Sequence, residues 1–372
     1  MEKSKVYFTD FRAKPGNNLL QKLEKLVKRA GIENIDFKNK YVAIKIHFGE
    51  PGNLAYLRPN YAKVIADVVK ELGGKPFLTD CNTLYVGGRK NALDHIDTAY
   101  LNGFTPFSTG CNVIIADGLK GTDEAYVDIN QEYVKTAKIG RAIMDADIII
   151  SLNHFKGHEA TGFGGAIKNI GMGCGSRAGK MEMHSAGKPE VILEHCKKCK
   201  QCIKICAHGA ISYNEEGKAQ INHSKCVGCG RCIGICNFDA ITSPNDEAVD
   251  ILNRKMTEYA YAVVKDRPQF HISLICDVSP NCDCHAENDA PIVPNIGLLA
   301  SYDMVALDKA CADLVNKQTA FTNSQLGEHI KQNINEKDNF HINHPDTNWE
   351  SQIEHGEKIG LGNSNYELIE IK

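Results

Sequence analysis

Two runs of four cysteines constrain the fold of this chain more than any other feature of its sequence. Both have the spacing C-x2-C-x2-C-x3-C, the first run being Cys196, Cys199, Cys202 and Cys206 and the second Cys226, Cys229, Cys232 and Cys236. Three thiolates spaced in this way on one loop can bind three irons of a cubane, and the fourth iron then needs a ligand from elsewhere. Zinc sites are the alternative, because C-x2-C pairs also bind zinc. Two copies of the full spacing favour a pair of cubane clusters.

Each run is followed by a strand-like segment, at 210–213 and at 240–242, so the region reads as an internal repeat. This repeat resembles the bacterial two-cluster ferredoxin family, although Ala207 and Asn237 stand where that family usually has proline. The resemblance implies two [4Fe–4S] clusters, with the last cysteine of each run bound to the cluster of the other run. The implied ligands are Cys196, Cys199, Cys202 and Cys236 for cluster 1, and Cys226, Cys229, Cys232 and Cys206 for cluster 2.

The chain as a whole has an ordinary globular composition, with 42% hydrophobic and 24% charged residues. No apolar run approaches the roughly 18 residues that a membrane span needs, and the charged start does not resemble a signal peptide. We therefore expect a cytoplasmic protein of a largely anaerobic cell, in which the 15 cysteines are metal ligands and reduced thiols. The net charge of −3 predicts no nucleic-acid partner.

Basic residues gather around the cysteines. Between 190 and 243 the chain has seven basic and five acidic residues, and four lysines surround the first run. Such charge would raise the encounter rate with an acidic electron carrier, a ferredoxin or flavodoxin, or with a redox enzyme. Solvated loop lysines are the alternative.

Outside this region, short apolar runs alternate with amphipathic stretches. The runs predict strands at 5–11, 41–47, 76–80, 112–117, 147–153, 270–276 and 366–371, and helices at 17–30, 59–72, 89–101, 138–145, 247–265, 303–316, 324–332 and 349–358. This order predicts an α/β fold, a helix-covered parallel or mixed sheet interrupted by an inserted ferredoxin-like 2x[4Fe–4S] domain. The expected parts are an α/β domain at 1–187 and 245–318, the insertion at 188–244 and a C-terminal appendage at 319–372.

Polar side chains follow three of the predicted strands. His47 ends the strand at 41–47, Asp80 ends the strand at 76–80, and His154 and His158 follow the strand at 147–153. Ligands of such sheets bind beyond the carboxyl ends of the strands. We therefore predict the rim of an active site at this edge, with ordinary polar loops as the alternative.

Eight glycines lie between 157 and 179. Glycine lets the backbone approach a ligand closely and point N–H groups at an anion, so Gly162, Gly164 and Gly165 are candidates for binding a cofactor phosphate or carboxylate. A structural loop in a tight corner explains the glycines equally well, and no Walker motif is present.

The segment HEATGFGGAIK at 158–168 resembles a motif of the lactate racemase family. In that family a lysine tethers a nickel-pincer cofactor, a later histidine ligates the nickel and an earlier histidine acts on the substrate. The resemblance implies these places for Lys168, His184 and His158. Loop histidines and a solvated lysine are the alternative.

Most of the chain also resembles the iron–sulfur protein family built on the domain of unknown function 362. The segments that carry the resemblance are HFGEPGN at 47–53, HFKGHEATGFGGAIKNIGMGC at 154–174, the cysteine region, and DVSPNCDCHAENDAPIVPNIGLLASYDMVALDKAC at 277–311. The resemblance implies a fold and a pair of clusters, but no settled reaction. In the last segment, Cys282 and Cys284 precede His285, and this group could bind a further metal or supply reactive thiols. We expect at least one of the two sulfurs to point elsewhere, with packing as plain thiols as the alternative.

These features predict an iron–sulfur electron-transfer protein, whose ferredoxin module feeds low-potential electrons to a redox site in the α/β domain. Such a protein would be an iron–sulfur oxidoreductase acting on a small molecule, and a further metal or cofactor in its site is left open. One alternative is an electron relay or adaptor without catalysis of its own, and another is a metal-dependent racemase or isomerase. The predicted site residues are His47, His154, His158, Lys168 and His184.

Overall fold

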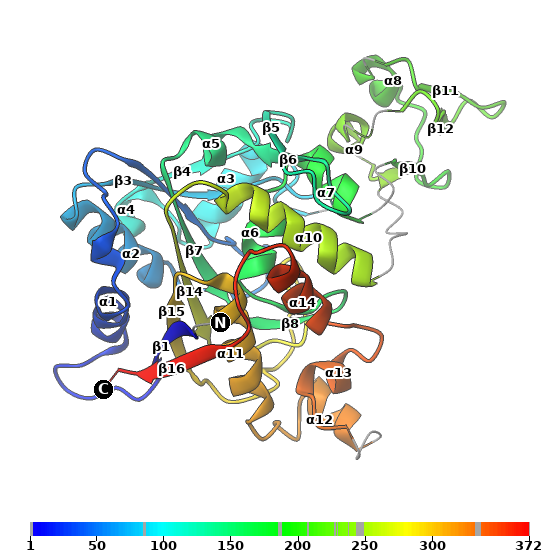
Figure 1. The fold of residues 1–372 in the computed structure, drawn as a ribbon. Coiled ribbons are helices and arrows are strands. Elements are labelled where there is room, and N and C mark those ends of the chain that lie inside the picture. The colour runs from blue at the N-terminus through cyan, green and yellow to red at the C-terminus, as the bar shows by residue number, and fades with distance from the viewer. Residues whose placement is uncertain are drawn as a thin grey trace.

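The computed structural model describes residues 3–84, 87–184, 188–206, 208–226, 228, 230–236, 238–242, 249–331 and 336–371. Its centre is an eight-stranded sheet (Figure 1). In spatial order the strands are β16 (Tyr366–Glu370), β1 (Ser4–Asp10), β15 (Gly297–Ser301), β14 (Gln269–Ile275), β7 (Ile148–His154), β2 (Tyr41–Lys45), β3 (Lys75–Asp80) and β4 (Asn112–Ile115). Within the described ranges, no helix combines the length and apolar character needed to cross a bilayer.

The sheet is mixed, as the sequence predicts. Strand β15 runs antiparallel to both of its neighbours, β1 and β14, whereas every other pair in the sheet is parallel. Because β7, β2 and β3 are parallel neighbours, their carboxyl ends meet at the same edge. The polar segments after these strands are therefore brought together.

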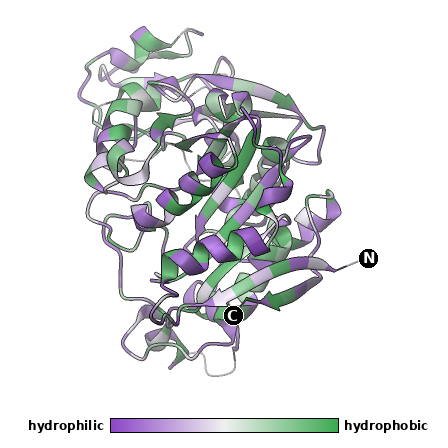
Figure 2. Ribbon diagram, turned by 90° about the vertical axis from the view of Figure 1, so that its left-hand side faces the viewer, coloured by the Kyte–Doolittle hydropathy of each residue, from purple (hydrophilic) through white to green (hydrophobic). Residues whose placement is uncertain are grey.

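Helices cover both faces of the sheet (Figures 1 and 2). In β7, Ile148 and Ile150 pack on one side and Ile149 on the other, since successive side chains of a strand alternate between its faces. One face carries α1 (Leu19–Arg29), α2 (Pro59–Glu71), α3 (Ala92–Leu101) and α4 (Pro106–Thr109), and the other α6 (Ala166–Cys174), α10 (Val249–Val264), α11 (Met304–Asn316), α13 (Asn339–Asn343) and α14 (Glu350–Lys358).

Two local predictions differ from the structure. The helix expected at 138–145 is confirmed only over α5 (Arg141–Asp145), because the first three of these residues end the strand β6 (Thr136–Gly140), which pairs with β5 (Glu124–Asp128). Burial of Ala137 and Ile139, with Lys138 between them half-buried, has the period of two that favours a strand. The glycine-rich stretch is not a loop, because it forms β9 (Gly162–Gly164), paired with β8 (Lys156–His158), and then α6 and α7 (Arg177–His184).

The C-terminal stretch at 319–372, expected as an appendage, is part of the main body. Its strand β16 pairs in parallel with β1, and its helix α14 packs on α10. Trp349 lies 5.4 Å from Phe163, measured between ring centroids, and so joins the hairpin of β8 and β9 to this stretch. The described part of the stretch also contains the helix α12 (Gln325–Ile330).

The cysteine region projects from one side of the sheet (Figure 1). We call residues 188–242 the cysteine module. It has two similar halves, with α8 (Gln201–Ile205) after Lys200 and α9 (Arg231–Ile235) after Gly230, both preceding residues having left-handed φ angles, of 66° and 65°. Short strands complete it, namely β10 (Glu190–Val191), β11 (Ile211–Tyr213), β12 (Ala219–Ile221) and β13 (Ile241–Thr242).

Candidate functional site

A cavity of about 580 Å³ opens at the carboxyl ends of β2, β3 and β7. Its walls also come from α6, α7 and the loop after β14. The structure brings the predicted site residues together here, because the lining includes His47, His154, His158, Lys168, His184, Cys282 and Cys284. Of the three candidate glycines only Gly165 lines this cavity.

A buried charge group forms one wall. The Lys45 ammonium lies 2.9 Å from a carboxylate oxygen of Asp80, and their side chains are 1% and 4% exposed. Arg89 lies 3.7 Å from the other oxygen of Asp80 and 2.8 Å from Glu50. Burial alone would raise the pKa of Asp80, but the surrounding cations, Lys45 first, hold it well below its ordinary value. Asp80 is therefore an ionised carboxylate between two cations.

An amide network extends this wall to α6. The Lys45 ammonium donates to the side-chain oxygen of Asn169 at 2.7 Å. The Asn169 amide nitrogen in turn donates to the side-chain oxygen of Asn153 at 2.8 Å. Lys45, Arg89 and Asn169 were not predicted as site residues. The sequence signal for Lys45 is a single cation inside an otherwise apolar strand, since a buried lysine needs a partner.

His154 has a positioning role. One ring nitrogen lies 2.9 Å from the Asp283 carboxylate and the other lies 2.8 Å from the carbonyl oxygen of Cys276. Burial would raise the pKa of Asp283, but His154 and Lys156 hold it well below its ordinary value. Because protein acceptors occupy both ring nitrogens, the predicted catalytic role does not fit His154. It holds the loop after β14 against the end of β7.

His158 and His47 line the cavity and accept backbone hydrogen bonds at Nδ1. Nδ1 of His158 accepts from the backbone N–H groups of Ala160 at 3.0 Å and Thr161 at 3.2 Å. Nδ1 of His47 accepts from the backbone N–H of Gly49 at 3.0 Å. In a neutral ring the proton is then on Nε2. Burial, and next the charge of Arg89, lower the pKa of His47 well below its ordinary value, so this ring is neutral.

Lys168 faces sulfur in the cavity. The Lys168 ammonium lies 3.5 Å from the Cys282 sulfur. A hydrogen bond from the Cys284 thiol lowers the pKa of Cys282 well below its ordinary value, opposed by burial and assisted by Lys168 and His158. Burial, with Lys168 next, lowers the pKa of His184 to about 3. Both sulfurs line the cavity, so the expectation that one would point elsewhere is wrong. Asp283 and Cys284 lie in a turn, closed by a hydrogen bond from the His285 backbone N–H to the carbonyl oxygen of Cys282 at 3.1 Å, so the rule for extended segments does not apply to this pair.

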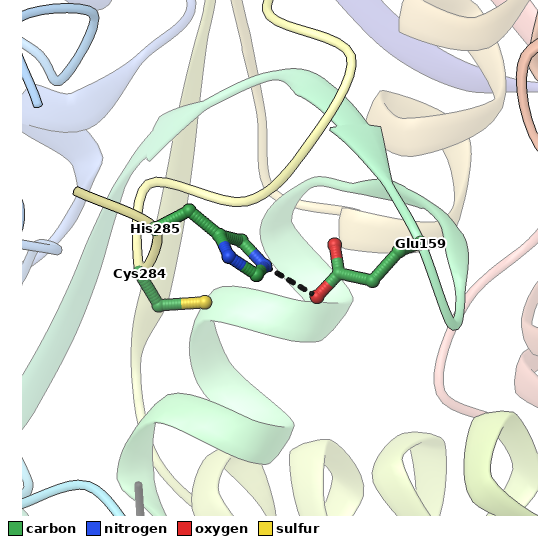
Figure 3. A group of neighbouring side chains, drawn as sticks. All are labelled: Glu159, Cys284 and His285. Carbon is green, nitrogen blue, oxygen red and sulfur yellow. Dashed lines mark hydrogen bonds and ion pairs between the residues drawn. The ribbon is translucent and has the colours of Figure 1, made fainter. Parts of the chain in front are cut away.

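Glu159, Cys284 and His285 form a group at the mouth of the cavity (Figure 3). Nε2 of His285 donates to the Glu159 carboxylate at 3.0 Å. This hydrogen bond raises the pKa of His285 to about 9. The three side chains lie close enough to share one metal ion. An ion pair between Glu159 and His285, with the Cys284 thiol beside it, accounts for the same arrangement.

The glycines of the glycine-rich stretch serve close packing. A Cβ at Gly171 would lie 2.1 Å from the carbonyl oxygen of Met256 in α10. A Cβ at Gly165 would lie 2.3 Å from the Asp308 carboxylate, which accepts from the backbone N–H groups of Ala166 at 2.7 Å and Ile167 at 2.8 Å. The N–H groups at the start of α6 are thus occupied by the protein's own carboxylate. The predicted anion-binding loop does not fit this arrangement.

Asp308→Asn should lower the free energy of unfolding by about 1–3 kcal/mol, because an amide has one acceptor oxygen for two buried N–H donors. Urea denaturation followed by circular dichroism measures the change. Asp313→Asn is the matched control on the same helix, where the half-buried carboxylate pairs with Lys309. Equal losses for the two variants would contradict the assigned role of Asp308.

The described cysteines of the two runs gather within the cysteine module. Cys196, Cys199 and Cys202 of the first run line one small cavity together with Cys236 of the second run. Backbone N–H groups donate to the sulfurs of Cys206 at 3.3 Å, Cys196 at 3.4 Å, Cys226 at 3.5 Å and Cys236 at 3.3 Å. Of the four ligands predicted for cluster 2, the structure describes Cys206, Cys226 and Cys232, whereas Cys229 lies outside the described residues.

The second half of the module sits on α7. Met181 of α7 and Leu84 share an apolar cluster with Cys232. Lys90 donates to the carbonyl oxygen of Cys236 at 2.9 Å. A Cβ at Gly230 would lie 2.7 Å from the side chain of Arg177, the first residue of α7. Helix α7 therefore contacts the module at Arg177 and Met181 and reaches the large cavity at His184.

Two solved structures are similar to this chain at low sequence identity. The lactate racemase apoprotein of Thermoanaerobacterium thermosaccharolyticum has a TM-score of 0.41 and 11% identity, covering 83% of this chain and 57% of that one. A Thermotoga maritima structure has a TM-score of 0.41 and 15% identity, covering 79% and 57%.

A thylakoid-associated protein of Synechocystis is 27% identical over 127 residues, which is 33% of this chain and only 35% of the relative. The chain thus matches about a third of the length of this curated relative. The family model for the domain of unknown function 362 covers residues 42–313, from β2 to the last turn of α11, and the chain belongs to that family.

Proposed function

We propose that this protein is an iron–sulfur redox protein, in which the cysteine module binds two [4Fe–4S] clusters and supplies electrons to a reaction in the large cavity. The observation that carries the proposal is that cysteines from both runs, Cys196, Cys199, Cys202 and Cys236, line one small cavity. In a two-cluster ferredoxin the last cysteine of each run binds the cluster of the other run, and this set of four cysteines has that composition.

The surroundings of the cysteines fit thiolate ligands. Backbone N–H donors at 3.3–3.5 Å stabilise negative charge on sulfur, and such hydrogen bonds tune the potential of a cluster. Bound clusters would supply one-electron transfer at low potential. The module's contact with α7 supports delivery to the cavity, because Met181 packs beside Cys232 and His184 lines the cavity.

Anaerobically purified protein is expected to contain about eight irons per chain and to show reversible cluster reduction by EPR. Cys236→Ser should perturb the cluster bound by the first run and remove up to about half of the iron. Cys276→Ala is the control, since this buried cysteine lies outside the module. Zinc in place of iron, or unchanged iron in Cys236→Ser, would refute the proposed ligand set.

A metal-dependent isomerase is the second candidate. It is favoured by one observation, that His158, Lys168 and His184 line the same cavity. In that case the clusters would be structural or sensory, and a metal other than iron should be lost in His184→Ala. Retention of the same metal content in His184→Ala would count against this candidate. If Lys168→Met leaves all turnover with redox partners intact, the protein is a relay without chemistry of its own.

A further inference from the structure

We propose that Cys282 is a nucleophilic thiolate and that it forms a redox-active dithiol with Cys284, acting on small disulfides that enter the cavity. Both cysteines line the cavity of about 580 Å³. Cys282 is only 1% exposed, so a reagent reaches it through the cavity rather than from the outer surface. The reaction of Cys282 and Cys284 with a disulfide does not depend on the proposed function. The source of the electrons that reduce the two cysteines again rests on the proposed function.

The position of its neighbours favours a negative charge on the Cys282 sulfur. Lys168 places its ammonium 3.5 Å away. His158 contributes Nε2–H as a further donor, because the N–H groups of Ala160 and Thr161 occupy its Nδ1. The cation and the oriented imidazole come from α6 and from β8. Both elements are held by the close packing described above, so the donors are fixed before any ligand binds.

The same neighbours disfavour a metal on Cys282. A divalent ion at the sulfur would lie beside the Lys168 ammonium, and the two positive charges would repel each other in a poorly solvated site. His158 could not add a ligand atom, since its Nδ1 accepts backbone hydrogen bonds and its Nε2 carries the proton. Hydrogen bonding therefore accounts for the surroundings of Cys282 better than metal coordination does.

Cys284 is placed to resolve a mixed disulfide. The turn that contains the two residues is closed by a hydrogen bond from the His285 backbone N–H to the carbonyl oxygen of Cys282 at 3.1 Å, and both cysteines line the same cavity. Cys282 sulfur attacks one sulfur of a disulfide RSSR, which forms a mixed disulfide and releases RS⁻. Cys284 sulfur then attacks the Cys282 sulfur, and its proton passes to the second leaving group, which departs as RSH. The products are RS⁻, RSH and a Cys282–Cys284 disulfide.

Two electrons and one proton return this disulfide to a thiolate and a thiol. Under the proposed function the electrons come from a low-potential one-electron donor through the module. The net reaction is RSSR + 2e⁻ + H⁺ → RS⁻ + RSH. The substrate class is therefore a disulfide small enough for the cavity.

Alkylation of the full-length, anaerobically purified protein tests the thiolate. Iodoacetamide at pH 6.5, followed by peptide mass spectrometry, should label Cys282 at least about tenfold faster than Cys276, because the thiolate is the reactive form. Lys168→Met should reduce the labelling rate of Cys282 severalfold and leave that of Cys276 unchanged. Equal rates at Cys282 and Cys276, or labelling of Cys282 only after a chelator has removed a metal, would overturn the proposal.

Oxidation tests the pair. Oxidised glutathione should produce a disulfide that is lost in Cys282→Ser and in Cys284→Ser and retained in Cys276→Ala. Dithionite titration of the oxidised protein should consume two more electrons per chain than titration of Cys284→Ser. If oxidised glutathione produces no such disulfide, the proposal that Cys282 and Cys284 form a redox-active dithiol is overturned. Formation of the disulfide in protein that lacks iron would refute the proposed function while supporting the pair, so the two failures are distinguishable.

Discussion

Asp80→Asn is expected to lower the free energy of unfolding by about 3–5 kcal/mol, because it removes the negative charge between two buried cations. Lys45 lies 2.9 Å from Asp80 and Arg89 lies 3.7 Å from it, and the side chains of these two cations are 1% and 2% exposed. Asparagine keeps the shape of the side chain but leaves the buried Lys45 without a carboxylate partner, whereas Arg89 keeps its ion pair with Glu50. Urea denaturation at neutral pH, analysed for midpoint and slope, measures the loss.

Asp67→Asn is the matched control, since this carboxylate pairs with Lys63 at 2.7 Å on the exposed side of α2. The free energy of unfolding of Asp67→Asn should fall by less than about 0.5 kcal/mol.

The Asp80 carboxylate of the wild-type protein also makes the stability depend on pH. Because the pKa of Asp80 is lowered in the folded protein, its stabilisation is complete above the unfolded pKa of about 3.9 and is lost as the pH falls toward the folded value. Asp80→Asn should lack this part of the acid sensitivity, and equal acid sensitivity in both proteins would contradict the ion-pair account.

Glu258→Ala is expected to cost about 3–5 kcal/mol, because it leaves several buried donors without an acceptor. The Glu258 carboxylate accepts from the backbone N–H groups of Tyr133 at 3.1 Å and Val134 at 2.6 Å. It also lies 2.9 Å from a ring nitrogen of His355 in α14. One fully buried side chain of α10 thus joins the loop after β5 to the C-terminal stretch. Thermal and urea unfolding measure the effect.

The control for Glu258 lies at the same interface. Glu132 pairs with Lys358 of α14 at 2.6 Å, and both side chains are exposed. Glu132→Ala should change the free energy of unfolding by less than about 1 kcal/mol. If both variants lose the same stability, burial of the Glu258 carboxylate is not what makes it important.

Periodic apolar runs predicted most of the central sheet. The strands near 41–45, 75–80 and 148–154 lie close to their expected places, since Val, Ile and Leu buried on both faces mark them. Strand β15 (Gly297–Ser301) was missed, because GLLAS has the length and composition of a short helical turn as well. The helix α6 was missed because its glycines lower the helix propensity of the segment. The helix forms nevertheless, since close packing of Gly171 against Met256 outweighs the low propensity.

Much of the candidate site could be predicted because histidines and cysteines after strands are conspicuous. The roles of individual residues could not, since they depend on partners far along the chain. His154 cannot be assigned without its contacts to Asp283 and Cys276, and the direction in which His158 donates depends on two backbone N–H groups. Asp308, more than 100 residues after α6, caps that helix, and no local pattern indicates this contact.

The place of β1 in the sheet has a kinetic consequence. Both of its partners, β15 and β16, belong to the last quarter of the chain. During synthesis β2, β3, β4 and β7 can pair as they emerge, whereas β1 must wait until nearly all of the chain has been made. Until then it is an unpaired strand that other nascent chains can bind, so we expect slow maturation and a need for chaperones during expression.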